Sequence, residues 1–188
     1  MTDAASFELT TVPEDLSLAI ANNEGSLEIS TEKLQGRHRR ISAAISIPCT
    51  AEQVWNVLTD YENLAEFIPN LTVSRRVESD DSKTLLEQVG SQCFLNIQFC
   101  ARVVLDMVEQ FPNSIRFTMV EGDFKTFEGA WQLQNNESED GTTRLVYDIT
   151  ICPPRAIPAL LIERHLRHDL TQNLQAIRSQ AIAVAGFA

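Results

Sequence analysis

Two histidines one helical turn apart are the first candidates for chemistry. His165 and His168 stand beside Asp169 and Glu163, so one face of a predicted helix could present several metal-ligating atoms. No further ligand follows at metal-site spacing, and the neighbouring sequence is rich in arginine, which disfavours a bound cation. We therefore expect these side chains to form a solvated helix flank, and we expect neither a metal nor another cofactor.

Carboxylates are the second set of candidates. General acid–base catalysis needs two ionisable groups held close together with separated pKa values. A hairpin tip accounts for Glu121 and Asp123, and Glu128 alternates with Phe127, so it should point away from an apolar interior. The sequence also contains no G-x-S-x-G, P-loop or dinucleotide-binding motif. We therefore name no catalytic residue.

Aromatic residues on the inward phase of predicted strands give a stronger signal. They recur at alternate positions, and alternate residues of a strand share one face. Gly129, between Phe127 and Trp131, leaves space on that face, which suits either a ligand or a β-bulge. A solid core is the competing interpretation for each aromatic residue taken alone. The predicted inward aromatic residues are Phe99, Phe117, Phe127, Trp131 and Tyr147.

Composition limits the classes of function. The chain has 188 residues, 44% of them hydrophobic, and a formal net charge of −11. A single domain of this size can enclose a lined cavity. The negative charge disfavours general nucleic-acid binding and strong binding to an anionic membrane, since both need clustered cations. The four cysteines fit small buried residues in a reducing compartment. Without a signal-peptide pattern or a membrane-spanning apolar run, we expect a cytoplasmic protein.

The chain divides into an N-terminal segment and a domain. Residues 1–36 are acidic and lack a regular apolar period, so we expect this segment to be partly disordered. The domain would occupy 37–188, beginning with a strand at 41–47. A capping box from Thr50 to Gln53 then predicts a short helix.

The remaining elements are a second short helix, strands and a long helix. Pro69 ends the second helix, and about six alternating strands follow it. An amphipathic helix of about 25 residues ends the chain, and its apolar stripe includes Ile162, Leu166 and Leu170. We therefore predict an α+β fold in which a curved antiparallel sheet wraps around the long C-terminal helix. The two short helices after the first strand would plug one open end.

Three stretches resemble a known family. They are IPCTAEQVWNVLTDYENLAEFIPNL (47–71), VEGDFKTFEGAWQL (120–133) and LIERHLRHDLTQNLQAIR (161–178). Together they resemble the START-like (SRPBCC) superfamily with its helix-grip fold, and within it the polyketide cyclase/dehydrase and coenzyme Q-binding branch of cyanobacterial or plastid type. The resemblance covers 41–184 and implies a deep cavity between sheet and helix for a lipid-like or aromatic ligand. It does not imply one function, because the superfamily includes carriers, quinone binders, cyclases and sensors.

These observations favour a protein that binds, and in a further role transports or presents, a hydrophobic small molecule such as a lipid, isoprenoid or quinone. The alternatives are a polyketide aromatase/cyclase-type enzyme and an interaction module with a vestigial pocket. The inward strand positions carry few polar groups, of which Tyr147 is the clearest, and this favours a binder over an enzyme. The expected ligand-binding residues are Phe67, Phe99, Phe117, Phe127, Trp131, Tyr147, Ile162, Leu166 and Leu170.

The predicted entrance lies where the last strand passes into the last helix. Pro153, Pro154 and Pro158 prevent regular backbone pairing there, although an ordinary proline-rich connection explains them too. Arg155 would hold a lipid head group, and the second short helix would form the facing rim. We expect no nucleic-acid partner and leave open a transient membrane contact and the oligomeric state. The expected entrance residues are Leu64, Ile68, Arg155, Ile157, Leu160 and Leu161.

Overall fold

The computed structural model describes residues 27–77, 83–94, 97–135, 141–155 and 159–186, with the backbone alone for 92–94, 97–99 and 159–163. Within these ranges the chain forms strands and helices in the order β1 (Glu28–Lys33), β2 (Arg39–Ile47), α1 (Ala51–Thr59), α2 (Leu64–Phe67), β3 (Leu71–Val77), β4 (Thr84–Phe94), β5 (Ile97–Gln110), β6 (Ser114–Gly122), β7 (Thr126–Asn135), β8 (Thr143–Cys152) and α3 (Ala159–Ala185).

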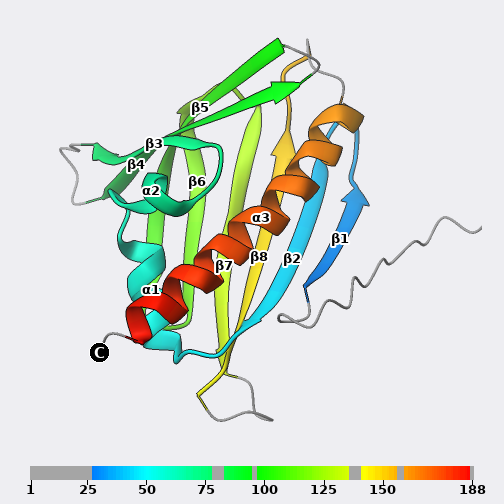
Figure 1. Cartoon of the computed structure of the whole chain (residues 1–188). Coiled ribbons are helices and arrows are strands. Elements are labelled where there is room, and N and C mark those ends of the chain that lie inside the picture. The colour runs from blue at the N-terminus through cyan, green and yellow to red at the C-terminus, as the bar shows by residue number, and fades with distance from the viewer. Residues whose placement is uncertain (1–26, 78–82, 95–96, 136–140, 156–158, 187–188) are drawn as a thin grey trace, which may run out of the picture.

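All the strands join one antiparallel sheet in the order β1-β2-β8-β7-β6-β5-β4-β3. The sheet curves around α3, which crosses its concave face diagonally from the end of β8 towards α1 (Figure 1). The two short helices lie between β2 and β3 in the chain. This arrangement confirms the predicted α+β helix-grip fold.

The core forms between the inward-facing side chains of the sheet and those of α3. Along β8, Leu145, Tyr147, Ile149 and Ile151 are buried at alternate positions, and all four belong to one hydrophobic cluster. The inward stripe of α3 joins the same cluster through Leu170, Leu174, Ile177 and Ala181. Burying each large aliphatic side chain contributes about 1.5–3 kcal/mol. The buried side chains recur at every second residue of the strand and at every third or fourth residue of the helix, and their packing holds the two layers together.

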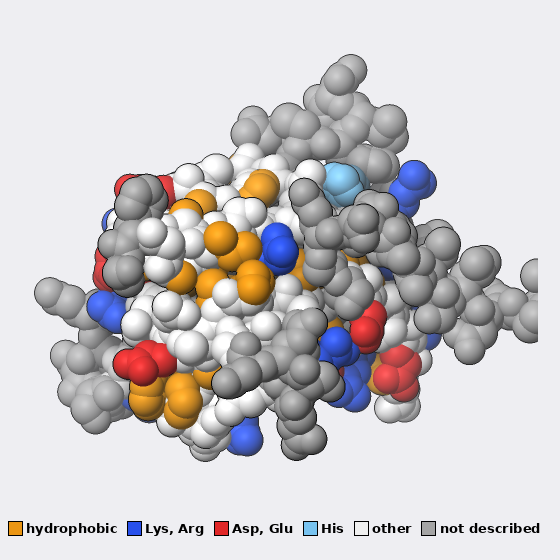
Figure 2. Space-filling view, turned by 60° about the horizontal axis from the view of Figure 1, so that its bottom comes forward, with side chains coloured by type: hydrophobic (Ala, Val, Ile, Leu, Met, Phe, Trp, Pro, Cys, Tyr) orange, Lys and Arg blue, Asp and Glu red, His pale blue; other side chains and the backbone are white. Residues whose placement is uncertain are grey.

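Helix α1 begins at the predicted capping box. The Gln53 backbone N–H donates to Thr50 Oγ1 over 3.3 Å, and the Thr50 backbone N–H donates to Gln53 Oε1 over 2.9 Å. Val54, Trp55 and Leu58 face the core, and α1 contacts α3 and β7. The helix therefore covers the end of the sheet where α3 terminates. Hydrophobic side chains gather near the middle of that end of the surface (Figure 2).

The N-terminal boundary differs from the expected one. Strand β1 lies within the segment expected to be acidic and partly disordered, and it pairs with β2 from Glu28↔Ala44 to Lys33↔Arg39. Leu27 and Ile29 pack against the core. The sequence pattern concealed this strand, because an edge strand with one covered face needs few apolar residues. Residues 1–26 lie outside the described ranges, so the expectation for them stays a prediction.

Candidate aromatic binding site

A continuous series of aromatic rings covers part of the concave face; we call it the ring series. Trp131 on β7 stacks on Tyr147 of β8, with ring centroids 3.8 Å apart. The Tyr147 ring lies 5.7 Å from that of Phe117 on β6, which lies 5.9 Å from Phe127. Phe127 in turn lies 5.3 Å from Phe124, in the turn between β6 and β7. These contacts bring together four of the five aromatic residues expected on the inward face.

The strand register explains why these rings meet. Trp131 lies directly opposite Tyr147 in the β7–β8 ladder, and Phe117 lies opposite Gly129 in the β6–β7 ladder. Phe117 and Tyr147 are buried, whereas Phe127 and Trp131 are half-buried. Cross-strand neighbours on one face are the side chains that interact most strongly in a sheet. The ring series is therefore set by register rather than by a loop.

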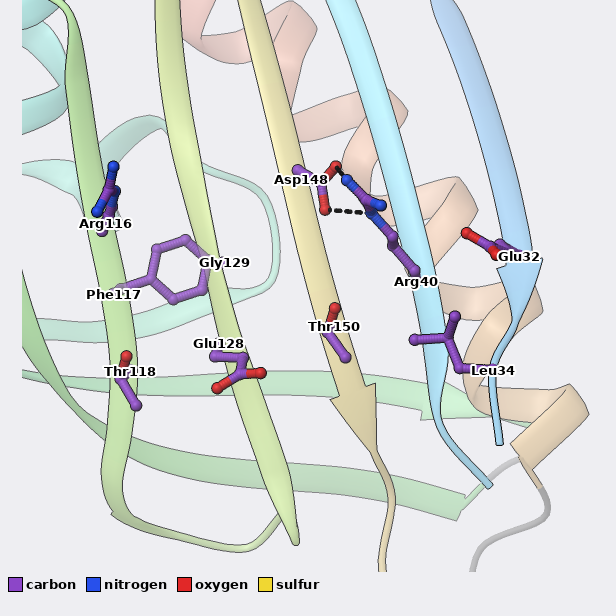
Figure 3. Close-up of a pocket in the computed structure, with 10 residues that line it drawn as sticks. All are labelled: Glu32, Leu34, Arg40, Arg116, Phe117, Thr118, Glu128, Gly129, Asp148 and Thr150. Atoms are coloured by element: carbon purple, nitrogen blue, oxygen red, sulfur yellow. Dashed lines mark hydrogen bonds and ion pairs between the residues drawn. The ribbon is translucent and has the colours of Figure 1, made fainter. Parts of the chain in front are cut away.

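Gly129 has a different role from the one expected. A Cβ atom at this position would lie 2.7 Å from Cζ of Phe117 and 2.1 Å from the backbone oxygen of Asp148. The Phe117 ring extends across β7 at this point (Figure 3). The space predicted beside Gly129 is thus occupied by Phe117, and the glycine allows that ring and β8 to approach the strand closely.

Tyr147 supplies the polar group of the ring series. Its side chain is 8% exposed, and its hydroxyl makes no hydrogen bond within the described part of the chain. Burial alone raises the pKa of Tyr147 above its ordinary value, so the hydroxyl keeps its proton at neutral pH and can only act as a donor or acceptor in neutral form. In contrast, the buried Tyr61 hydroxyl donates to Glu109 Oε1 over 2.7 Å. Tyr61 is therefore satisfied by the protein, and Tyr147 is not.

A second unsatisfied polar group comes from α3. Asn173 follows Leu170 by three residues and precedes Ile177 by four, so it occupies the same stripe of the helix. Its Oδ1 atom is buried and has no hydrogen-bond partner among the described residues. Sequence reasoning missed Asn173 because the stripe was followed through its apolar members only. A polar residue at a stripe position was the signal that could have identified it.

Side-chain positions are known for only some of the remaining predicted ligand-binding residues. Leu170 is buried in the core, and Leu166 and Phe67 are half-buried against it. Only the backbone is described for Phe99 and Ile162. The structure thus brings the described members of the expected set to one core, and contact with a ligand stays a prediction.

The predicted entrance residues come from two places. On α2, Leu64 is buried and Ile68, just after the helix, is half-buried. Arg155 is exposed after β8, near Pro154, whose backbone oxygen accepts a hydrogen bond from Arg37 over 3.1 Å. In Figure 1, α2 and the start of α3 lie on opposite sides of the view. The side chains of Leu160 and Leu161 are outside the described part, as is the whole of Ile157, so the entrance also stays a prediction.

The convex face of the same sheet has ionic chemistry. Glu87 accepts hydrogen bonds from Arg75 and Arg102, each over 2.6 Å, and Arg102 also donates to Glu121 over 2.5 Å. These arginines hold the pKa of the Glu87 carboxyl below its ordinary value, with the hydrogen bond from Arg102 the largest cause. Since Arg102 belongs to this outer face, it does not enter the ring series.

A shallow hollow of about 490 Å³ also lies on the convex face. Its floor includes Glu128, Thr150 and Asp148, whose carboxylate accepts hydrogen bonds from Arg40 over 2.6–3.0 Å (Figure 3). Glu128 therefore points away from the ring series, as predicted. The hollow is open and has several charged side chains in its lining, which suits solvent better than a hydrophobic ligand.

The described residues offer neither a metal-binding cluster nor a membrane-spanning helix. No three His, Cys, Asp or Glu side chains among the described residues lie close enough together to hold a metal ion. His168 is exposed and His165 is half-buried. None of the helices in the described ranges is long and apolar enough to cross a bilayer.

Solved structures share this fold at low sequence identity. A STAR-related lipid transfer protein of Xanthomonas axonopodis has a TM-score of 0.68 and 16% identity, over 89% of this chain and 99% of the other. The ZhuI aromatase/cyclase of a Streptomyces species has a TM-score of 0.63 and 14% identity, over 77% and 93%. A START superfamily protein of Mycobacterium smegmatis has a TM-score of 0.63 and 13% identity, over 77% and 98%.

Sequence comparison gives partial relatives and a family. The chain is 28% identical over 93 residues to the ribosome association toxin RatA of Escherichia coli K12, across 50% of this chain and 56% of RatA. It therefore spans about half the length of the curated relatives it matches. A family described as "Polyketide cyclase / dehydrase and lipid transport" matches residues 47–178. Since that match covers more than half of the 188 residues, the chain belongs to this polyketide cyclase/dehydrase and lipid transport family.

Proposed function

We propose that the chain binds a hydrophobic small molecule between the ring series and α3. The observation that carries this proposal is a pair of unpartnered polar groups at an aromatic wall: the Tyr147 hydroxyl makes no hydrogen bond within the described residues, and the Oδ1 atom of Asn173 is buried without one. Leaving a buried polar atom such as Asn173 Oδ1 unsatisfied costs about 1–3 kcal/mol. A ligand hydroxyl that donates to Asn173 would remove that cost, Tyr147 would donate to a ligand oxygen, and the rings would cover the ligand's apolar body.

The two polar groups narrow the class of ligand. Tyr147 can donate to a carbonyl or hydroxyl oxygen, and Asn173 Oδ1 can accept from a ligand hydroxyl. An isoprenoid alcohol or a lipid with a free hydroxyl near its apolar part meets both conditions, and a quinone meets the first through its carbonyl oxygens. The proposal also includes three more specific points. The chain would belong to the coenzyme Q-binding branch, would act in the cytoplasm, and would transport or present its ligand.

An aromatase/cyclase-type enzyme is the alternative, and Tyr147 is also the observation that favours it. A protonated hydroxyl in an apolar wall can stabilise a carbonyl oxygen on which negative charge develops. A cyclase would also need a group that removes a proton. The ring contacts of Tyr147 involve only other aromatic side chains, and this favours binding over catalysis.

Native mass spectrometry of the purified full chain tests the proposal. We expect a species heavier than the chain by the mass of a small molecule, and solvent extraction should release that molecule for identification. The variant Tyr147→Phe/Asn173→Leu should retain less of it. The matched variant Arg116→Gln, on the convex face, should retain the wild-type amount. A chain that carries no molecule and takes up none of the three ligand classes would overturn the proposal.

A further inference from the structure

Cations gather at one end of the sheet, which we call the basic end. Here β1 ends, β2 begins, β6 turns into β7, and β8 passes into α3 (Figure 1). The chain has 15 lysines and arginines in total, and a large share of them lie at this end. The basic end comprises Lys33, Arg37, Arg39, Lys125, Arg155, Arg164 and Arg167.

Register and hydrogen bonds place these residues together. Lys33 pairs with Arg39 in the β1–β2 ladder. The Arg37 guanidinium donates to the backbone oxygen of Pro154, next to Arg155. The Lys125 backbone N–H donates to the backbone oxygen of Cys152, at the end of β8, over 2.8 Å. Helix α3 begins four residues after Arg155, so the remaining two arginines lie in its first turns.

Five cations at this end form no ion pair with a described residue. Within the described ranges, no ion pair is formed by Lys33, Lys125, Arg155, Arg164 or Arg167. All of them are exposed except Arg167, which is half-buried. Ion pairs are formed by Arg40, which lies beside the basic end, and elsewhere on the molecule by Arg75, Arg76, Lys83, Arg102 and Arg144.

Two acidic residues near the basic end have other partners. Glu121 is paired with Arg102, and the Asp123 carboxylate accepts a hydrogen bond from the Arg102 backbone N–H over 2.7 Å. The five cations without an ion pair among the described residues are therefore available to neutralise anions outside the protein. Phosphate groups are the anions that several separate lysines and arginines suit best.

The ring series reaches the surface at the same end. Phe124 stands next to Lys125 in the β6–β7 turn, and its ring contacts Phe127, which continues the series inward. A hydrophobic molecule that left a phosphate-containing surface at this end would next contact the aromatic rings. The opposite end, turned forward in Figure 2, shows hydrophobic side chains in its middle and scattered charges around them.

We propose that the basic end docks on a membrane surface containing anionic phospholipid, from which a hydrophobic ligand passes to the ring series. The passage of a ligand rests on the proposed function, whereas the docking rests on charge alone. The net charge of −11 does not oppose it, because physiological salt screens charges over about 8 Å. RNA offers phosphates too, but aromatic rings that reach the surface beside the cations favour a lipid layer.

Vesicle binding of the full chain tests the docking. We expect cosedimentation with phosphatidylcholine vesicles that contain phosphatidylglycerol, little with phosphatidylcholine alone, and release by high salt. Each cation near an anionic surface contributes about fivefold in affinity, so Lys125→Gln/Arg155→Gln should weaken binding about 25-fold. The control Lys83→Gln/Arg116→Gln removes one lysine and one arginine from other exposed positions and should bind as the wild type does.

Three results would overturn the docking. These are equal binding to neutral and anionic vesicles, equal weakening by the test and control variants, and binding to single-stranded RNA but not to anionic vesicles. The assay contains no hydrophobic ligand, so its outcome is independent of the interior site. Vesicle binding by a protein that takes up no ligand would contradict the proposed function alone, and ligand uptake without vesicle binding would contradict the docking alone.

Discussion

The two faces of this sheet treat polar groups in opposite ways. On the convex face, Glu87 accepts from both Arg75 and Arg102, so its charge is fully paired beside solvent. On the concave face, Tyr147 is buried among rings and its hydroxyl has no partner within the described part of the chain. Opposite these rings, the Oδ1 atom of Asn173 on α3 is buried without a partner among the described residues. Buried polar groups in native proteins are normally hydrogen-bonded, so this atom needs an explanation. We infer that a polar group is satisfied by the protein where it supports the fold and by a ligand where it supports binding.

The two faces differ because successive residues of a strand point to opposite sides of the sheet. Glu128 lies on the convex face, and its neighbours Phe127 and Gly129 lie on the concave one. A register slip of one residue would exchange the two chemistries. Four predictions follow from the contrast, and the first has the largest expected effect.

Gly129→Ala should be the most damaging single change on the concave face. The new methyl group would meet the Asp148 backbone oxygen, which cannot move aside as a flexible side chain can, and it would also displace the Phe117 ring. We expect a loss of about 3 kcal/mol or more in the free energy of unfolding. For a chain of this length that corresponds to a fall of about 6–12 °C in Tm, measured by calorimetry.

The matched control for this change is Gly90→Ala on β4. A Cβ there would meet nothing nearer than the Asn70 backbone oxygen at 3.8 Å, an ordinary van der Waals contact. We expect its Tm to stay near that of the wild type. Equal effects of the two substitutions would show that the close approach of Phe117 to Gly129 is unimportant.

Glu87→Gln should lower Tm at neutral pH by less than Gly129→Ala does, because its ion pairs lie beside solvent. Since the folded-state pKa of Glu87 is lowered, its stabilisation is present above the unfolded pKa and is lost as pH falls through the folded value. The Tm difference between variant and wild type should therefore shrink as pH is lowered below the ordinary carboxyl range of about 4. A difference that grows under acid would contradict the pairing.

Tyr147→Phe should have the smallest effect on stability. It removes a hydroxyl that makes no hydrogen bond to a described residue, so the free energy of unfolding should stay within about 1 kcal/mol of the wild-type value. Ligand affinity should fall about 5- to 10-fold, the equivalent of one hydrogen bond of about 1 kcal/mol or slightly more. Isothermal titration measures the affinity.

Tyr61→Phe is the comparison for this substitution and should do the reverse. The lost hydrogen bond to Glu109 should lower Tm, and ligand affinity should stay unchanged. If Tyr147→Phe lowers Tm more than Tyr61→Phe and leaves affinity intact, the Tyr147 hydroxyl supports the fold rather than a ligand.

Local signals explain which elements the sequence predicted. The apolar alternation of β8, the capping box at Thr50 and the stripe of α3 through Leu170 and Leu174 each lie within one segment of the chain. Their positions therefore followed from short windows of sequence. Strand β1 was missed, because its residues from Glu28 to Glu32 contain a single large apolar side chain.

The candidate site was predictable in part. Strand phase identified the inward position of Phe117, Phe127, Trp131 and Tyr147 without any long-range information. The occupation of the space at Gly129 was not predictable, because it depends on the Phe117 ring crossing from a neighbouring strand. The unsatisfied Oδ1 of Asn173 is likewise a property of packing between helix and sheet, which no sequence window contains.

Tryptophan fluorescence tests the central claim most directly, because the chain has only two tryptophans. The variant Trp55→Phe leaves Trp131 as the reporter in the ring series, and Trp131→Phe leaves Trp55, which packs edge-on against Phe111. Both proteins are titrated with the extracted molecule or, without one, with an isoprenoid alcohol, a quinone and a fatty acid. We predict a saturable change in the emission of Trp131 and none in that of Trp55. No change in Trp131, or equal changes in both, would contradict binding at the ring series.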